Sequence, residues 1–321
     1  MSISRSSIQS LLFVGLGAIV FVVVLISDLE FTSQVFFSKT TELPVYHHYN
    51  ESTVYKIPKV CYQTWVTKDH TKLTNITLEV LAENKRLNPD IDFQLWDDND
   101  VIDFIKREFP GEVYESFITI NPKYGAARAD FFRYCVLYKY GGLYMDIKSH
   151  FRIKNIFGDI IQPEDECVLD LRKGLETYRL LWNYWTYEQW VLAFAPGHPY
   201  LRRMIERMVR SIKEKVATPV APTDEGPAWA AKYQVMRVTG PDALAVAIHD
   251  AVIDYGVRHR EVDYRKWVKY SKVGKNPEYA NLHVAHYNEV KDSFYVKSSP
   301  RKGRRLRNWK NNNDDNSITR D

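Results

Sequence analysis

The stretch Ala127-Arg-Ala-Asp-Phe-Phe-Arg-Tyr-Cys-Val-Leu-Tyr-Lys-Tyr-Gly-Gly-Leu-Tyr-Met-Asp-Ile-Lys148 contains a complete helix–turn–strand pattern. Asn121-Pro122, just upstream, is typical of a helix start, and the apolar spacing predicts a helix that continues to Tyr140. Gly141-Gly142 predicts the end of that helix, because glycine adopts the left-handed conformation at little cost. The side chains of residues 143–148 then alternate in character, which predicts a strand.

Strands and helices alternate on both sides of this unit. Strands are predicted over residues 60–62, 93–96 and 168–171, and helices over residues 73–87, 98–109, 199–216 and 241–252. We expect Asp98 or Asn99 to cap the second of these helices. Such alternation predicts an α/β fold, with a mixed sheet and helices on both of its faces.

The first 27 residues differ in kind from the rest. Residues 11–26 form an unbroken run of apolar residues and glycine, close to the ~20 residues that a membrane span needs. Arg5 precedes the run and Asp28 follows it, so the positive-inside tendency puts the N-terminus in the cytoplasm. A cleaved signal peptide is the alternative, but no small-x-small cleavage site follows the run. We therefore expect a single-pass type II anchor, with the remainder of the chain in the lumen.

Short spans suit the thin membranes of the early secretory pathway, which favours the Golgi or the ER. Sequons at Asn50 and Asn75 agree with a luminal glycoprotein. The expected organisation is a cytoplasmic tail (1–10), a transmembrane signal anchor (11–27), a stem (28–55), a folded domain (56–297) and a disordered basic tail (298–321).

Composition narrows the classes of function. With 45% hydrophobic residues the chain can bury a full core, so global disorder is excluded. The net charge of +4 comes partly from the basic tail, which we interpret as solvated and not as a nucleic-acid patch. Cys61, Cys135 and Cys167 have no zinc-type spacing, and they allow either one disulfide or free buried thiols.

Three ionisable residues of the central unit point to a ligand site. Asp130 and Arg133 are three apart, so they share one face of the helix, although an isolated pair at this spacing is most often an ordinary surface pair. Asp146 lies near the end of the following strand. Ligands of open α/β sheets bind beyond the carboxyl ends of the strands, so these three residues are candidates for one crevice.

The combination Ala127-x-x-Asp130-x-x-Arg133-Tyr134 with Tyr140-Gly141-Gly142-x-Tyr144-x-Asp146 resembles the sugar-binding region of DXD glycosyltransferases. Within these it is similar to glycosyltransferase family 32, which includes fungal Golgi mannosyltransferases and the inositol-phosphoceramide mannosyltransferase. The large clostridial glucosylating toxins share the pattern more distantly. The resemblance covers about residues 57–290, including Thr239-Gly240-Pro241.

This resemblance implies a GT-A type, Rossmann-like fold and a hexosyltransferase that acts on a nucleotide sugar. The favoured donor is GDP-mannose, with a UDP-hexose as the alternative, and transfer is expected to retain the anomeric configuration. The acceptor is expected to be a glycan or a glycolipid such as a sphingolipid, and the usual metal is Mn²⁺. A catalytically silent, membrane-anchored nucleotide-sugar-binding protein is the alternative from another class.

The resemblance also implies roles for individual residues. Trp65 would lie against the nucleotide base. Asp130 and Arg133 would hold the hydroxyls of the donor sugar or its diphosphate. Asp146 would stand for the first Asp of Asp-x-Asp, near the ribose and the metal. The predicted catalytic residues are Asp130, Arg133, Asp146 and Lys148, and the predicted donor-binding residues are Trp65, Asp130, Arg133, Tyr144 and Asp146.

Lys148 departs from the pattern, because the resemblance expects a second Asp there and a charged lysine cannot ligate a metal. One hypothesis is that Lys148 pairs with the diphosphate and replaces part of the cation's charge. Another is that the metal stays on Asp146 with help from His283 or His286. A third is that the enzyme is inactive.

Residues 178–190 are dense in aromatic side chains, which either belong to the core or stack on a sugar. We expect two or three of them to be exposed and to contact the acceptor. Within the stretch, Asn183, Trp185 and Glu188 are the candidate acceptor-binding residues.

Overall fold

The computed structural model describes Leu43 and residues 54–170, 187–215, 232, 234–257, 259–263, 266–270 and 293–296. The predicted cytoplasmic tail, membrane anchor, most of the stem and the basic tail lie outside these residues, as do Asn183, Trp185, His283 and His286. Among the helices that are described, none is both long enough and apolar enough to cross a membrane.

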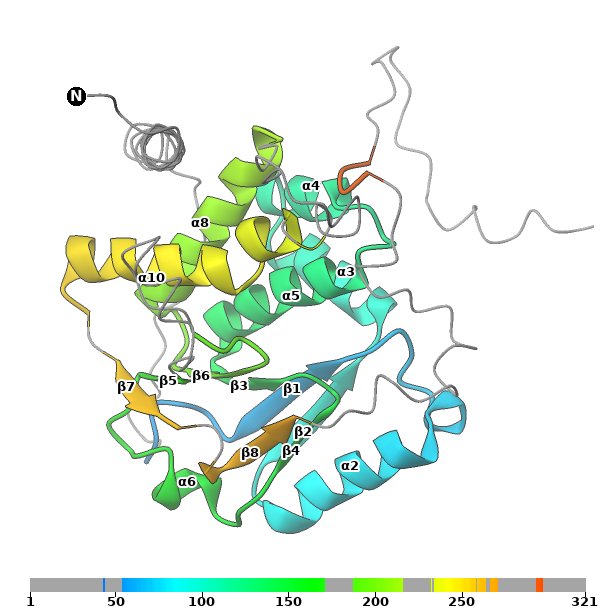
Figure 1. Ribbon diagram of the computed structural model, residues 1–321, viewed down its shortest axis with the longest axis vertical. Helices are drawn as coiled ribbons and strands as arrows, with labels where there is room; N and C mark the ends of the chain where they lie inside the picture. Colours follow the sequence, from blue (N-terminus) through cyan, green and yellow to red (C-terminus); the bar gives the residue numbers. More distant parts are fainter. Residues whose placement is uncertain are drawn as a thin grey trace, which may run out of the picture.

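A six-stranded mixed sheet in the order β2-β1-β3-β6-β5-β7 forms the centre of the molecule (Figure 1). Its strands are β1 (Val60–Thr64), β2 (Asp92–Trp96), β3 (Gly142–Met145), β5 (Cys167–Asp170), β6 (Val191–Phe194) and β7 (Arg260–Val262). β1 pairs in parallel with β2 and β3, β7 pairs in parallel with β5, and β6 runs antiparallel to β3 and β5. The carboxyl ends of β1, β2 and β3 therefore meet at one edge, where β6 begins.

Helices cover both faces of the sheet, as the alternation predicts (Figure 1). One face carries α3 (Asp98–Glu108), α4 (Glu112–Thr119), α5 (Gly125–Tyr140), α8 (Pro199–Lys213) and α10 (Pro241–Tyr255). The other carries α2 (Asn75–Leu87), the short α6 (Ile156–Asp159) and a small sheet of β4 (Ser149–Phe151) and β8 (Val268–Tyr270). A single turn of 3-10 helix, η1 (His70–Lys72), precedes α2.

Burial along β3 follows the predicted alternation. Tyr144 packs into the core beneath α5, whereas Leu143 and Met145 pack into the core on the opposite face. The three cysteines are buried and free.

The turn between α5 and β3 depends on glycine. Gly141 and Gly142 have φ angles of +66° and +99°, which side chains rarely adopt. A Cβ atom on Gly142 would lie 2.7 Å from the carbonyl oxygen of Val60 on the neighbouring strand. Close approach of β3 to β1 therefore requires glycine here, and this approach fixes where Asp146 emerges from the sheet.

Two boundaries of the central unit differ from the prediction. The helix begins at Gly125, because Asn121 forms a turn in which its side chain accepts from the backbone N–H of Lys123 at 3.1 Å. The strand ends at Met145 and not at Lys148. The backbone N–H of Ser149 donates to the carbonyl of Asp146 at 2.7 Å, so residues 146–149 form a turn that leads into β4.

Two further details of the helices were not predicted correctly. Asp97 caps α3, and not Asp98 or Asn99, because its carboxylate accepts from the backbone N–H of Asp100 while Asp100 returns the bond in a capping box. The short helix α4 was not predicted.

Candidate active site

The predicted site residues lie at one edge of the sheet, at the carboxyl ends of β1 and β3. Tyr62 on β1 is in register with Tyr144 on β3, so Trp65 and Asp146 both follow just beyond the paired strands. Gln189 lies directly before β6, whose Val191 pairs with Met145. Three segments distant in the chain therefore meet at one place.

Arg133 is the centre of a cluster at this edge. Its Nη2 lies 3.0 Å from Oδ1 of Asp130 and 3.0 Å from Oδ1 of Asp146. Nη1 donates to the carbonyl oxygen of Gln189 at 2.7 Å. The guanidinium group also stacks on the ring of Tyr144, with 4.4 Å between its carbon and the ring centroid. Asp130 and Arg133, three positions apart on the helix, therefore form a buried pair within the site and not a surface pair.

Burial and charge act in opposite directions on the pKa of Arg133. Burial alone would lower this pKa, but Tyr144 and the carboxylates of Asp130 and Asp146 outweigh it and raise the pKa. Arg133 is therefore a fixed positive charge between two carboxylates.

Asp130 is enclosed on all sides. Besides Arg133, its carboxylate accepts from the hydroxyl of Thr239 at 3.1 Å and from Nε2 of Gln189 at 3.2 Å. Burial raises the pKa of Asp130 to about 6, the nearby charge of Asp146 adds to this, and Arg133 opposes it.

The hydroxyl of Tyr134 completes the enclosure from α5. It donates to Oε1 of Gln189 at 2.6 Å and lies 3.2 Å from the carbonyl oxygen of Thr239. The side chain of Gln189 is therefore oriented at both ends, by Tyr134 and by Asp130. Hydrogen bonds at both ends hold this side chain in one arrangement.

Asp146 is the carboxylate of the cluster that reaches the surface. Its side chain is 28% exposed, against 4% for Asp130 and for Arg133. Its backbone is held by the carbonyl of Trp190 at 2.9 Å and by the turn to Ser149. Asp146 can thus offer a carboxylate oxygen to a ligand while its Oδ1 stays bound to Arg133.

Trp65 and Lys148 lie beside this carboxylate. Both are half-buried, and Nζ of Lys148 is 5.8 Å from the centroid of the Trp65 ring. The backbone N–H of Trp65 donates to the carbonyl of Trp96 at 3.0 Å, which ties the end of β1 to the end of β2. Burial lowers the pKa of Lys148, and the charge of Asp146 opposes this shift.

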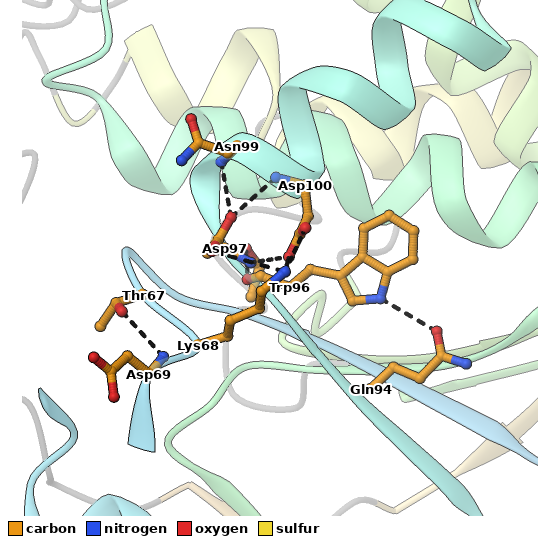
Figure 2. A network of polar contacts seen from close by, with 9 residues as sticks. Thr67, Lys68, Asp69, Gln94, Trp96, Asp97, Asn99 and Asp100 are labelled. Carbon is orange, nitrogen blue, oxygen red and sulfur yellow. Dashed lines mark hydrogen bonds and ion pairs between the residues drawn. The ribbon is translucent and has the colours of Figure 1, made fainter. Parts of the chain in front are cut away.

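The loop after β1 is fastened to the start of α3 (Figure 2). Nζ of Lys68 binds both carboxylate oxygens of Asp100, at 2.6 and 2.7 Å. Asp97 in turn accepts from the backbone N–H groups of Asn99 and Asp100, each at 3.0 Å. These contacts fix the chain immediately beyond Trp65.

The described residues do not make up a site for Mn²⁺. Among them, no group of three or more His, Cys, Asp or Glu side chains could hold a metal ion. Of the predicted ligands only Asp146 is described, and one of its oxygens binds Arg133. His283 and His286 fall in the part of the chain that is not described, so a metal site that includes them stays a prediction.

The structure thus brings Asp130, Arg133, Tyr144 and Asp146 together and puts Trp65 and Lys148 next to them. Of the predicted acceptor-binding residues only Glu188 is described, and its carboxylate accepts from the ring N–H of Trp190 at 2.9 Å.

Gln189 and Thr239 belong to the cluster, and sequence reasoning assigned a role to neither. Thr239 is the first residue of Thr239-Gly240-Pro241, which is part of the resemblance to DXD glycosyltransferases. That motif could therefore have identified Thr239 as a site residue from the sequence. Nothing comparable marked Gln189 within the aromatic stretch.

Comparison with known proteins finds similarity to glycosyltransferases. Residues 47–168 match the family described as "Glycosyltransferase sugar-binding region containing DXD motif". Inositol phosphoceramide mannosyltransferase 3 of Schizosaccharomyces pombe is 35% identical over 174 residues, which cover 52% of this chain and 41% of that protein. Mannosyl phosphorylinositol ceramide synthase CSH1 of Saccharomyces cerevisiae is 33% identical over 248 residues, which cover 76% of this chain and 52% of the synthase. The matches thus span about half the length of these relatives, or less.

Two solved structures are also similar. The UDP-bound glycosyltransferase domain of the YGT toxin has a TM-score of 0.45 at 10% identity, and covers 72% of this chain and 87% of its own. The PaToxG glycosyltransferase has a TM-score of 0.40 at 16% identity, over 61% of this chain and 70% of its own. The family match and the motifs agree over residues 47–168, where this chain is similar to glycosyltransferase sugar-binding regions that contain a DXD motif.

Proposed function

We propose that this chain is a GT-A type hexosyltransferase that moves mannose from GDP-mannose to an inositol phosphoceramide, with retention of configuration. The names of the relatives support the sugar and the sphingolipid acceptor, because both are mannosyl-transferring enzymes of inositol phosphoceramide. The family match supports the nucleotide-sugar donor.

The observation that carries the proposal is the guanidinium group of Arg133 joined to both Asp130 and Asp146 at the ligand edge of the sheet. When the bond between the sugar and the diphosphate breaks, the anomeric carbon becomes positive and the diphosphate becomes more negative. Fixed charges that need no rearrangement stabilise such a transition state best. The buried cluster holds the positive charge of Arg133 in place between two carboxylates.

The members of the cluster have different roles in the proposed reaction. Asp146 has an exposed oxygen that can accept a hydrogen bond from a hydroxyl of the donor. Asp130 is saturated by protein partners and positions Arg133. The resemblance implies direct contact between Arg133 and the diphosphate, and Nε of Arg133 is a donor of the guanidinium group that has no hydrogen-bond partner among the described residues.

We also propose that the enzyme is a type II membrane protein of the Golgi, with residues 11–27 as its anchor and the catalytic domain in the lumen. The apolar run and the flanking charges support this arrangement. A membrane-bound acceptor fits an anchored enzyme, because both are then held at the same surface.

A transfer assay tests the proposed function. The full chain, purified in detergent, would be incubated with inositol phosphoceramide in mixed micelles and with GDP-mannose, UDP-glucose or UDP-galactose in parallel. Mass spectrometry should detect a lipid product heavier by one hexose with GDP-mannose, and NMR of that product should show the anomeric configuration of the donor.

Each other outcome has a defined meaning. Transfer from a UDP-hexose alone would replace the proposed donor. Binding of a nucleotide sugar without transfer, at the same level in wild type and in Asp146→Asn, would favour the catalytically silent binding protein and reject the enzyme.

A further inference from the structure

The turn after β3 carries Lys148 back over the sheet edge. Residues 146–149 close this turn through the backbone bond from Ser149 to Asp146. Nζ of Lys148 then lies 5.8 Å from the centroid of the Trp65 ring, and the side chain is half-buried. The ammonium group therefore lies near an aromatic ring, and the charge of Asp146 acts on it.

In the described part of the chain, Lys148 forms no ion pair. The charge of Asp146 acts on it, but the carboxylate of Asp146 is bound to Arg133. Lys68 at the same edge is different, because its ammonium group is neutralised by Asp100 at 2.6 Å (Figure 2). A half-buried cation without a counter-ion costs free energy, which an anionic ligand can recover.

Resting on the proposed function, we propose that the ammonium group of Lys148 binds the diphosphate of the nucleotide sugar directly and does the work of a divalent cation at this site. A lysine offers three charged N–H donors to phosphate oxygens. The ring of Trp65 next to it offers a face on which a base or ribose can pack. Binding of a nucleoside diphosphate by this chain accordingly requires no Mn²⁺.

The donor set agrees with this assignment. The described residues contain no group of three or more His, Cys, Asp or Glu side chains that could hold a metal ion, and the carboxylate of Asp146 already has a cationic partner in Arg133. A second cation at position 148 would repel Mn²⁺ from the same space.

The test measures binding of GDP and UDP to the full chain by calorimetry, in EDTA and in Mn²⁺. Wild type should bind one of them in EDTA, with an affinity that Mn²⁺ changes less than about 3-fold. Lys148→Met keeps most of the side-chain volume but not the charge, and should weaken binding by about 10- to 100-fold in both conditions. Lys148→Asp should lose binding in EDTA and regain it in Mn²⁺.

Lys154→Asp is the matched control, because Lys154 is exposed and the substitution makes the same change in net charge. It should bind as wild type does. The comparison of wild type in EDTA and in Mn²⁺ needs no variant, so the inference can be tested even if the Lys148 variants do not fold.

The outcomes separate this inference from the proposed function. Binding by wild type only in the presence of Mn²⁺, or undiminished binding by Lys148→Met, would overturn the role of Lys148 and leave the glycosyltransferase intact. Absence of nucleotide binding in every condition, together with absence of transfer, would overturn both.

Discussion

Nη2 of Arg133 lies 3.0 Å from Oδ1 of Asp146, although one residue is in the middle of a helix and the other follows a strand. The same nitrogen lies 3.0 Å from Oδ1 of Asp130. One buried guanidinium group therefore holds two carboxylates at the edge of the sheet. Removal of the guanidinium group would leave the two carboxylates facing each other. Substitution of each member of the cluster therefore has a measurable effect.

Arg133→Met should strongly destabilise the fold. The variant leaves the buried carboxylate of Asp130 without its cation, and breaking a buried pair in this way costs about 3–5 kcal/mol. Arg86→Met is the control, because Arg86 pairs with Glu83 on the surface and should leave the free energy of unfolding nearly unchanged. Urea denaturation measures the free energy of unfolding of both variants. Equal losses would show that the buried cluster contributes no more to stability than a surface ion pair.

Asp146→Asn should abolish most transfer while the protein stays folded. The substitution removes the charge from the exposed member of the cluster, so we expect activity to fall by about 100-fold or more. Thermal unfolding should change little because the side chain is 28% exposed. Asp103→Asn, at an exposed position on α3, should behave as wild type in both measurements. Normal turnover by Asp146→Asn would remove this carboxylate from the mechanism.

Asp130 should make stability depend on pH. Burial raises its pKa to about 6 in the folded protein, above a value of about 4 in the unfolded chain. The folded state therefore holds this proton more tightly, and the resulting stability is complete below pH ~4 and is lost as the pH rises through ~6. The loss should amount to about 2–3 kcal/mol.

Urea unfolding of wild type and Asp130→Asn at several pH values between 4 and 7 measures this contribution, because all other groups cancel in the difference. The stability of wild type relative to the variant should fall with rising pH. A difference that stays constant, or that rises with pH, would contradict the raised pKa of Asp130.

Gly142→Ala should destabilise the junction of α5 and β3. The added Cβ would lie 2.6 Å from Cγ1 and 2.7 Å from the carbonyl oxygen of Val60, at a φ of +99°. We expect a loss of about 2–4 kcal/mol and weaker activity, because β3 must move away from β1. A Cβ atom on Gly125, the first residue of α5, would meet nothing within 4 Å, so Gly125→Ala should be neutral or stabilising by up to about 1 kcal/mol. Thermal and urea unfolding of the two variants check this contrast.

Much of the central unit could be predicted from the sequence, because its determinants are local. The spacing of Asp130 and Arg133 puts both on one face of a helix whatever surrounds it. The same holds for β3, where Tyr144 faces one core while Leu143 and Met145 face the other. The predicted end of the strand was wrong by three residues, because the chain turns from Asp146 to Ser149 and enters β4, which pairs with the distant β8.

The sequence by itself determined the α/β character of the chain, the helix–glycine–strand unit and the presence of two carboxylates and an arginine near one strand end. Only the tertiary structure decided that Gln189, 56 positions from Arg133, and Thr239, 109 positions from Asp130, complete the cluster. Helical and strand periodicities follow from hydrogen bonds between backbone groups of fixed geometry, so they can be recognised in a short segment. The pairing of β3 with β6, and the packing that brings Thr239 against α5, depend on how the whole core closes, and no short segment contains that information.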